Sequence, residues 1–115
     1  IFGDGSQSRD FTYVEDIARG TVAALKPLGY EVINLGNNHP DKLSTAIELI
    51  EEYTGKKAEK VYKEFHKADI FATWADVSKA KHLLDWEPTV GLEEGLKRSV
   101  EWARENWEWV KEIIL

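Results

Sequence analysis

The 115-residue chain has the length of one domain, or of one piece of a larger one. Hydrophobic residues at 43% and charged residues at 31% indicate a folded globular chain, and no apolar run approaches the roughly 18 residues of a membrane span. The net charge of -6 argues against nucleic acid as the main partner, because phosphate backbones need a basic face. The absence of cysteine excludes disulfides and cysteine-based zinc sites and fits a cytoplasmic location.

The first residues predict a turn followed by a strand and a helix. Residues 1–8 are expected to end a strand in a glycine-rich turn, and the alternation over 9–13 predicts a further short strand. Thr12 followed three residues later by Glu15 has the pattern of a capping box. A helix is therefore expected to begin at about Val14.

The rest of the chain alternates between strand-like and helix-like segments. EVINL predicts a strand of buried, parallel type at 31–35, and AEKVY predicts a second strand at 58–62. Apolar residues at helical spacing predict helices over 43–53, over 77–84 and, as one long last helix, over 92–110.

The expected order β-α-β-α-β-α-α places the chain in the mixed α/β class. A parallel strand needs neighbours, and this sequence offers few candidates. Together with the absence of methionine, this leads us to expect a fragment or a processed chain, organised as one domain over residues 1–115.

Two familiar motifs are present only in part. Gly3 and Gly5 give a G-x-G pattern, but no third glycine follows at the dinucleotide-binding spacing, so a plain turn explains them better. Tyr53 and Lys57 match the Tyr-x-x-x-Lys spacing of short-chain dehydrogenase catalysis. Gly55 falls between them and is expected to end the helix, so we interpret the pair as a helix end followed by a basic loop.

The remaining polar residues form no evident catalytic or metal-binding set. The three histidines share no metal-ligand spacing, and neither Glu51-Glu52 nor Glu93-Glu94 has the arrangement of an acid-base pair, so these acids are expected on solvated faces. Asp69 lies in an irregular loop rich in large side chains. Such a residue lines a ligand site or caps a turn, and spacing alone leaves both interpretations open.

The last predicted helix is rich in tryptophan. Three of them lie within eight positions and cannot all face one core, namely Trp102, Trp107 and Trp109. Either this helix is partly exposed on its own domain, or it is a docking surface, for example in a homodimer.

The opening segment IFGDGSQSRDFTYVEDIARG resembles the GDG-x-x-x-RDF-x-x-V-x-D segment of the extended short-chain dehydrogenase/reductase enzymes, which act on nucleotide sugars. YEVINLGN, TWADVSKAKHLLDWEP and LEEGL follow in the family's order. Within the family the chain is most similar to UDP-glucuronate 4-epimerases, with UDP-galactose 4-epimerases and dTDP-glucose 4,6-dehydratases as near relatives. The resemblance implies a Rossmann-type parent protein and covers its C-terminal, substrate-binding part.

The resemblance also implies site residues. Arg9, the arginine of the RDF motif, would grip the nucleotide diphosphate, and Gln7 would help to hold the nucleotide. Asp69 corresponds to the aspartate of the family's P-G-D-V-P loop, which contacts the ribose or orients a basic neighbour, and His66 falls where relatives have Gln or Arg. The loop departs from the family pattern, with Ala68 in place of its glycine.

The family's glycine-rich NAD fingerprint and its catalytic Tyr-x-x-x-Lys lie N-terminal to the matching region. The leading hypothesis is therefore the UDP-sugar-binding part of an NAD-dependent 4-epimerase, which alone neither binds NAD nor catalyses the reaction. Two alternatives stay open. One is a 4,6-dehydratase of the same family, and the other is a non-catalytic module that self-associates through the tryptophan-rich helix.

Overall fold

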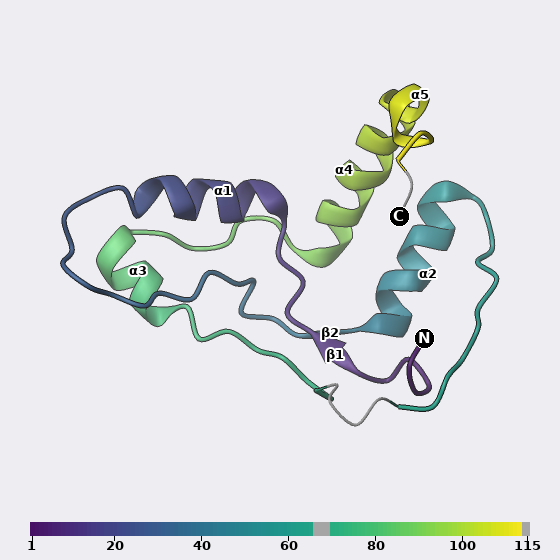
Figure 1. Cartoon of the computed structure of the whole chain (residues 1–115), viewed down its shortest axis with the longest axis horizontal. Helices are drawn as coiled ribbons and strands as arrows, with labels where there is room; N and C mark the ends of the chain where they lie inside the picture. Colours follow the sequence, from purple (N-terminus) through teal and green to yellow (C-terminus); the bar gives the residue numbers. More distant parts are fainter. Residues whose placement is uncertain (66–69, 114–115) are drawn as a thin grey trace.

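The computed structural model describes residues 1–65 and 70–113 and confirms a mixed α/β chain (Figure 1). It contains helices around a two-stranded antiparallel sheet; in chain order the elements are β1 (Ser8–Arg9), α1 (Val14–Ala23), β2 (Asp41–Lys42), α2 (Leu43–Thr54), α3 (Ser78–Leu84), α4 (Leu92–Glu105) and α5 (Trp107–Val110). In Figure 1, α1 and α3 lie at one end, α2, α4 and α5 lie at the other, and the sheet lies between them.

The strand β1 is the meeting point of segments that are far apart in sequence. Ser8 pairs with Lys42 and Arg9 with Asp41 in the antiparallel register. Ser8 also forms an isolated parallel bridge with Ala72, so β1 has a neighbour on each side. β2 precedes α2, and Ala72 follows the long connection after α2. Both therefore pair with β1.

The core at the α1–α3 end is built around Trp86. This side chain is 1% exposed and packs with Val77, Ala80 and Leu84. Its indole N–H donates to the Asp16 carbonyl at 2.9 Å, which satisfies the one polar group of the ring. Gly20 lies so close to this indole that a Cβ there would stand 2.9 Å from its nitrogen.

The molecule is more open than a compact domain of its length. Its radius of gyration is 16.5 Å, whereas about 13 Å is expected for a compact domain of this size. Large apolar side chains are exposed along one stripe of α1 and just beyond it, where Val14, Val22 and Leu25 are 69%, 66% and 83% exposed. No helix in the described ranges has the length and apolar character to cross a bilayer.

The helix boundaries follow the sequence closely in α1 and α2. α1 begins at Val14 as predicted, and α2 ends where Gly55 adopts the left-handed φ of 70° that favours glycine. The predicted capping box is wrong, because the Thr12 hydroxyl donates to the Asp10 carbonyl at 3.3 Å and the N-cap residue is Tyr13.

Two of the predicted strands are absent, and one is shortened. Only Ser8–Arg9 forms a strand near the predicted 9–13, and neither 31–35 nor 58–62 is a strand in the structure. Ile33 and Leu35 do pack against the core, but no described segment pairs with theirs in a ladder. The predicted burial is thus met at Ile33 and Leu35 but not at Val32, which is 66% exposed, and strand formation also needs a hydrogen-bonded neighbour.

The predicted single last helix is interrupted at Asn106. The Asn106 amide donates to the Trp102 carbonyl at 2.9 Å, and its oxygen accepts from the Trp109 indole at 3.3 Å. A side chain that bonds to the nearby backbone competes with the helix, so α4 ends at Glu105 and α5 starts afresh.

Glu51 is also a correction. It was expected on a solvated face but is 7% exposed, and its carboxylate accepts hydrogen bonds from the Lys57 ammonium at 2.7 Å and from the Ala58 N–H at 3.0 Å. Lys60 adds an ion pair at 3.1 Å. These contacts lower the pKa of the Glu51 carboxyl to about 2, with the hydrogen bond from Lys57 as the largest cause. They fold the chain after α2 back onto that helix.

Candidate functional site

Arg9 projects from β1 toward the segment at 70–72. Its Nη1 donates to the carbonyl of Ser8 at 2.8 Å and to that of Phe71 at 3.3 Å. The Phe71 carbonyl also accepts from the Ser8 N–H at 3.0 Å, so side chain and backbone converge on one peptide group. The guanidinium is therefore held in a defined place at the edge of the sheet.

Gln7 lies one residue before β1 and is 5% exposed. Its Nε2 donates to the Phe2 carbonyl at 2.9 Å, which ties the glycine turn of residues 3–5 to the strand. Its own carbonyl accepts from the Leu43 N–H at 2.9 Å, at the start of α2. In this structure the Gln7 side chain thus shapes the backbone beside Arg9.

The other two predicted site residues, His66 and Asp69, lie outside the described residues. The two that are described, Gln7 and Arg9, lie two positions apart on one segment. Phe71, which accepts from Arg9, comes two residues after Asp69.

Asp10 is a residue of this region that sequence reasoning did not single out. Its carboxylate accepts hydrogen bonds from the N–H groups of Asn37, Asn38 and Ala75, at 2.9, 3.2 and 2.9 Å. The acid therefore joins β1 to two other segments. The one signal in the sequence is the Gly-Asn-Asn stretch at 36–38, since such residues favour turns whose N–H groups converge.

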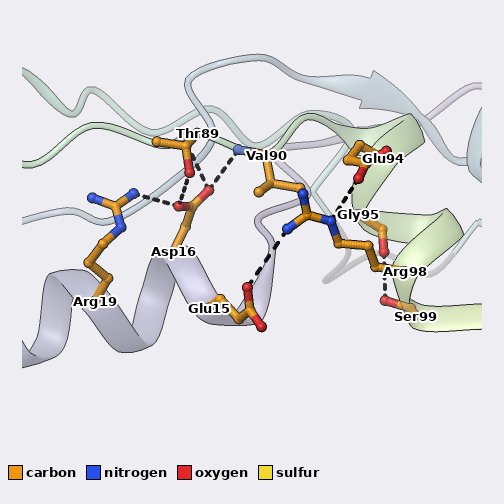
Figure 2. A network of polar contacts seen from close by, with 9 residues as sticks. All are labelled: Glu15, Asp16, Arg19, Thr89, Val90, Glu94, Gly95, Arg98 and Ser99. Atoms are coloured by element: carbon orange, nitrogen blue, oxygen red, sulfur yellow. Dashed lines mark hydrogen bonds and ion pairs between the residues drawn. The ribbon is translucent and has the colours of Figure 1, made fainter. Parts of the chain in front are cut away.

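Asp16 anchors the next stretch of chain and was also missed (Figure 2). It is 2% exposed, and its carboxylate accepts from the N–H and the hydroxyl of Thr89, from the N–H of Val90 and from Arg19. Burial alone would raise the pKa of this carboxyl, but the hydrogen bonds from Thr89, Arg19 and Val90 outweigh burial and lower it.

Arg98 links the same end of α1 to α4. Its side chain donates to Glu94 at 2.7 Å and lies 3.8 Å from the Glu15 carboxylate, as Figure 2 shows. The guanidinium also stands 5.7 Å from the centre of the Tyr13 ring. Asp16 and Arg98 together fix the start of α1 against α4 and the loop that precedes it.

A cleft of about 730 Å³ lies between α2 and α4. Its walls include Leu49, Tyr53, Leu92 and Lys97, and His39 and Asp41 stand at one side with Nδ1 and Oδ2 3.2 Å apart. Neither Gln7 nor Arg9, the two predicted site residues that the structure describes, lines it. In the described part of the chain no three His, Asp or Glu side chains gather as a metal site requires.

Tyr53 and Lys57 do not form a catalytic pair. Gly55 ends the helix between them, and the Lys57 ammonium bonds to Glu51 instead. Burial and the nearby carboxylates of Glu93 and Glu52 raise the pKa of the Tyr53 hydroxyl, whereas catalysis would need a lowered one. The interpretation of this motif as a helix end is confirmed.

The described residues do not fit a dinucleotide cofactor. The G-x-G turn at 3–5 leads into β1, and the first helix begins only at Val14. A dinucleotide site needs a glycine turn that opens directly into a helix, so that the pyrophosphate meets the helix N-terminus.

Comparison with known proteins decides the family. The family model described as GDP-mannose 4,6 dehydratase matches residues 1–99. The chain belongs to the NAD-dependent nucleotide-sugar epimerases and dehydratases of the extended short-chain dehydrogenase/reductase family. The predicted family and its Rossmann-type relationship are thereby confirmed.

Similar members of this epimerase/dehydratase family include a UDP-glucuronate 4-epimerase of Thermodesulfobacterium geofontis. It is 60% identical over 98% of this chain and 35% of its own length. A structure of UDP-glucuronic acid 4-epimerase from Bacillus cereus, in complex with UDP-glucuronic acid and NAD, has a TM-score of 0.81 and 41% identity over 92% of this chain and 35% of that one. An epimerase structure from Methanothermobacter thermautotrophicus has a TM-score of 0.88 and 38% identity over 97% and 34%. The chain thus spans about a third of the length of these family members.

Proposed function

We propose that this chain is the C-terminal domain of a nucleotide-sugar 4-epimerase, over residues 1–115, and that it binds the nucleotide diphosphate of a UDP-sugar such as UDP-glucuronate. The observation that carries the proposal is the place of Arg9, at a strand end with its Nη1 held by two carbonyls. Support comes from the 60% identity to a protein of that activity.

Arg9 has the chemistry that a diphosphate needs. Its guanidinium is planar and always charged, and it presents several donors that match phosphate oxygens. The chain carries a net charge of -6, so an anionic ligand must be held by a locally placed cation and not by a general positive field. A guanidinium already fixed to the Phe71 carbonyl loses little further freedom when a ligand arrives.

Gln7 supports this site by holding the turn next to β1, and we propose that it also lies close to the nucleotide. For His66 and Asp69 we propose contacts with the same ligand, on the ground of the family resemblance.

The 4-epimerase reaction itself requires NAD, which supplies hydride transfer when bound, and we propose that this chain alone does not bind it. The described residues contain no glycine turn that opens directly into a helix. The relatives are longer than this chain. We further propose that their additional part covers the exposed apolar stripe of α1, with Val14, Val22 and Leu25.

An amide-resolved NMR titration of the chain tests the proposal. UDP should shift the signals of Ser8, Arg9 and Phe71 with saturation, UMP should do so more weakly, and uridine should leave them unchanged, since the diphosphate supplies the charge that Arg9 recognises. Equal shifts from uridine and UDP, shifts confined to other residues, or no shifts would contradict the proposal.

A second candidate function is self-association through the tryptophan-rich end. Trp102, Trp107 and Trp109 are 50%, 55% and 49% exposed. The rings of Trp102 and Trp109 pack edge to face, with their centroids 5.5 Å apart. Such an aromatic surface is typical of an interface between copies. Sedimentation should show a dimer that Trp107→Ala weakens, and a monomer at every concentration would contradict it.

A further inference from the structure

The Asp10 carboxylate occupies a nest of backbone N–H groups. Oδ1 accepts from Asn37 at 2.9 Å and, with a longer bond of 3.5 Å, from His39, while Oδ2 accepts from Asn38 at 3.2 Å and from Ala75 at 2.9 Å. Asn38 has a left-handed φ of 55°, and successive N–H groups in such a turn form an anion-binding concavity. The anion in this concavity is the chain's own side chain.

Only a carboxylate satisfies this nest. Both oxygens of Asp10 face N–H donors, so an isosteric amide would place its NH2 group against donors in either orientation. At Asp16 the situation differs, because Oδ1 meets the Thr89 hydroxyl, which can accept a hydrogen bond as well as donate one, and the Arg19 guanidinium, which is 45% exposed and can turn to solvent. The two acids are therefore a matched pair in which one tolerates Asn far better than the other.

The nest is connected to both sides of Arg9. The Asp10 N–H donates to the Thr73 hydroxyl at 3.2 Å, and the Thr73 N–H donates to the Ser8 carbonyl at 3.2 Å. The segment from Phe71 to Thr73 is thus hydrogen-bonded to β1 at both of these residues. On the opposite side, the loop at 36–39 leads into β2, where Asp41 pairs with Arg9.

We propose that Asp10 is a positioning residue for Arg9. By clamping the loop at 36–39 and the segment at 73–75 onto the end of β1, its carboxylate keeps the Arg9 guanidinium where the nucleotide diphosphate is bound. This inference rests on the proposed function, in which Arg9 is the diphosphate ligand. The inference predicts that replacing Asp10 weakens UDP binding by more than it lowers the free energy of unfolding.

The nest is reachable from solvent. Asp10 is half-buried and lines an open hollow of about 330 Å³ with Gly36, Thr73 and Trp74. A small carboxylate such as formate can therefore enter the space that a truncated side chain leaves. Restored function on addition of formate is a result that a merely structural loss would not give.

The experiment compares Asp10→Asn and Asp10→Ala with Asp16→Asn as the matched control. UDP affinity is measured by calorimetry, and the Arg9 Nε–H signal is followed by NMR. Both Asp10 variants should weaken UDP binding by about tenfold or more and move the Arg9 signal, because four donors lose their anion. Asp16→Asn should leave both readouts unchanged.

Formate separates positioning from general damage. It should restore much of the UDP affinity of Asp10→Ala but not of Asp10→Asn, whose amide fills the nest. In the native chain formate can only compete with UDP for Arg9, so its effect there has the opposite sign. Sodium chloride at the same concentrations controls for ionic strength.

Native-like UDP affinity in a folded Asp10→Asn chain, or no restoration of a folded Asp10→Ala chain by formate, would overturn the inference. If the Asp10 variants fail to fold, Thr73→Val removes the hydroxyl link alone. It should weaken UDP binding by about threefold and move the Arg9 signal, and no change would overturn the inference. If the native chain does not bind UDP, the proposed function fails. The Arg9 signal then decides the positioning effect by itself, with a shift in Asp10→Asn but not in Asp16→Asn supporting it and equal signals overturning it.

Discussion

Asp16 and Thr89 are joined by two hydrogen bonds of 2.8 Å, one from the Thr89 N–H to Oδ2 and one from its hydroxyl to Oδ1. The two residues are 73 positions apart, so these bonds fix the first turn of α1 against the loop that precedes α4. The Val90 N–H also donates to this carboxylate, at 3.0 Å. Asp16 therefore provides the acceptor for two backbone N–H groups, those of Thr89 and Val90.

Replacing Asp16 should therefore lower the free energy of unfolding according to which acceptors are lost. Asp16→Ala removes all of them and should cost about 3 kcal/mol, whereas Asp16→Asn keeps an oxygen for the two N–H groups and should cost about 1 kcal/mol. Urea denaturation measures both. A loss below about 0.5 kcal/mol for Asp16→Ala, the size typical of surface changes, would contradict this role.

Glu51 should make stability depend on acid pH. Its pKa is lowered from 4.5 to about 2 in the folded chain, mainly by Lys57 and the Ala58 N–H. A lowered folded-state pKa adds stability above the ordinary value, and this contribution is lost as the pH falls from about 4.5 toward 2.

Glu51→Gln should consequently lower the thermal midpoint at neutral pH, and the difference from the native chain should shrink as the pH approaches 2. The neighbouring Glu52 is exposed, so Glu52→Gln is the matched control and should follow the native curve. Scanning calorimetry at a series of pH values records this. If the difference in thermal midpoint between Glu51→Gln and the native chain stays constant over that range, the contacts of Glu51 do not stabilise the fold through its ionisation.

Gly36 should not tolerate a side chain. An added Cβ would lie 2.4 Å from the Ala75 Cβ and 2.9 Å from the Asp10 Oδ2, so Gly36→Ala forces the loop and the segment apart. A loss of about 2 kcal/mol or more in the free energy of unfolding is expected. Gly91 has open space around the same position, and Gly91→Ala should change stability by less than about 0.5 kcal/mol. Equal effects of the two variants would contradict the close approach.

The sequence was most informative where structure depends on neighbours along the chain. Gly55 marks the end of α2 because a left-handed residue is a local requirement, and the apolar spacing located α4 because its contacts repeat every turn. The strand predictions at 31–35 and 58–62 failed because pairing depends on a distant segment, as when Ser8 meets Ala72.

The same limit explains what was missed in the site. Arg9 is predicted from the RDF motif, and the structure shows its Nη1 donating to the Phe71 carbonyl at 3.3 Å, while its contact with phosphate stays a prediction. Asp10 and Asp16 look like ordinary surface acids in sequence, because their donors are backbone N–H groups up to 65 and 74 residues away. Glu51 was likewise assigned to a solvated face, since the return of the chain at Lys57 is not visible in composition.

Calorimetric titration of UDP into the native chain, Arg9→Gln and Arg104→Gln tests the central proposal most directly. Arg104 is a matched arginine whose guanidinium donates to the Tyr53 carbonyl, at the α2–α4 end of the molecule. The proposal predicts that Arg9→Gln weakens UDP binding by about tenfold or more, through loss of charged hydrogen bonds to phosphate, and that Arg104→Gln binds as the native chain does. Native-like binding by Arg9→Gln, or an equal loss in Arg104→Gln, would contradict it.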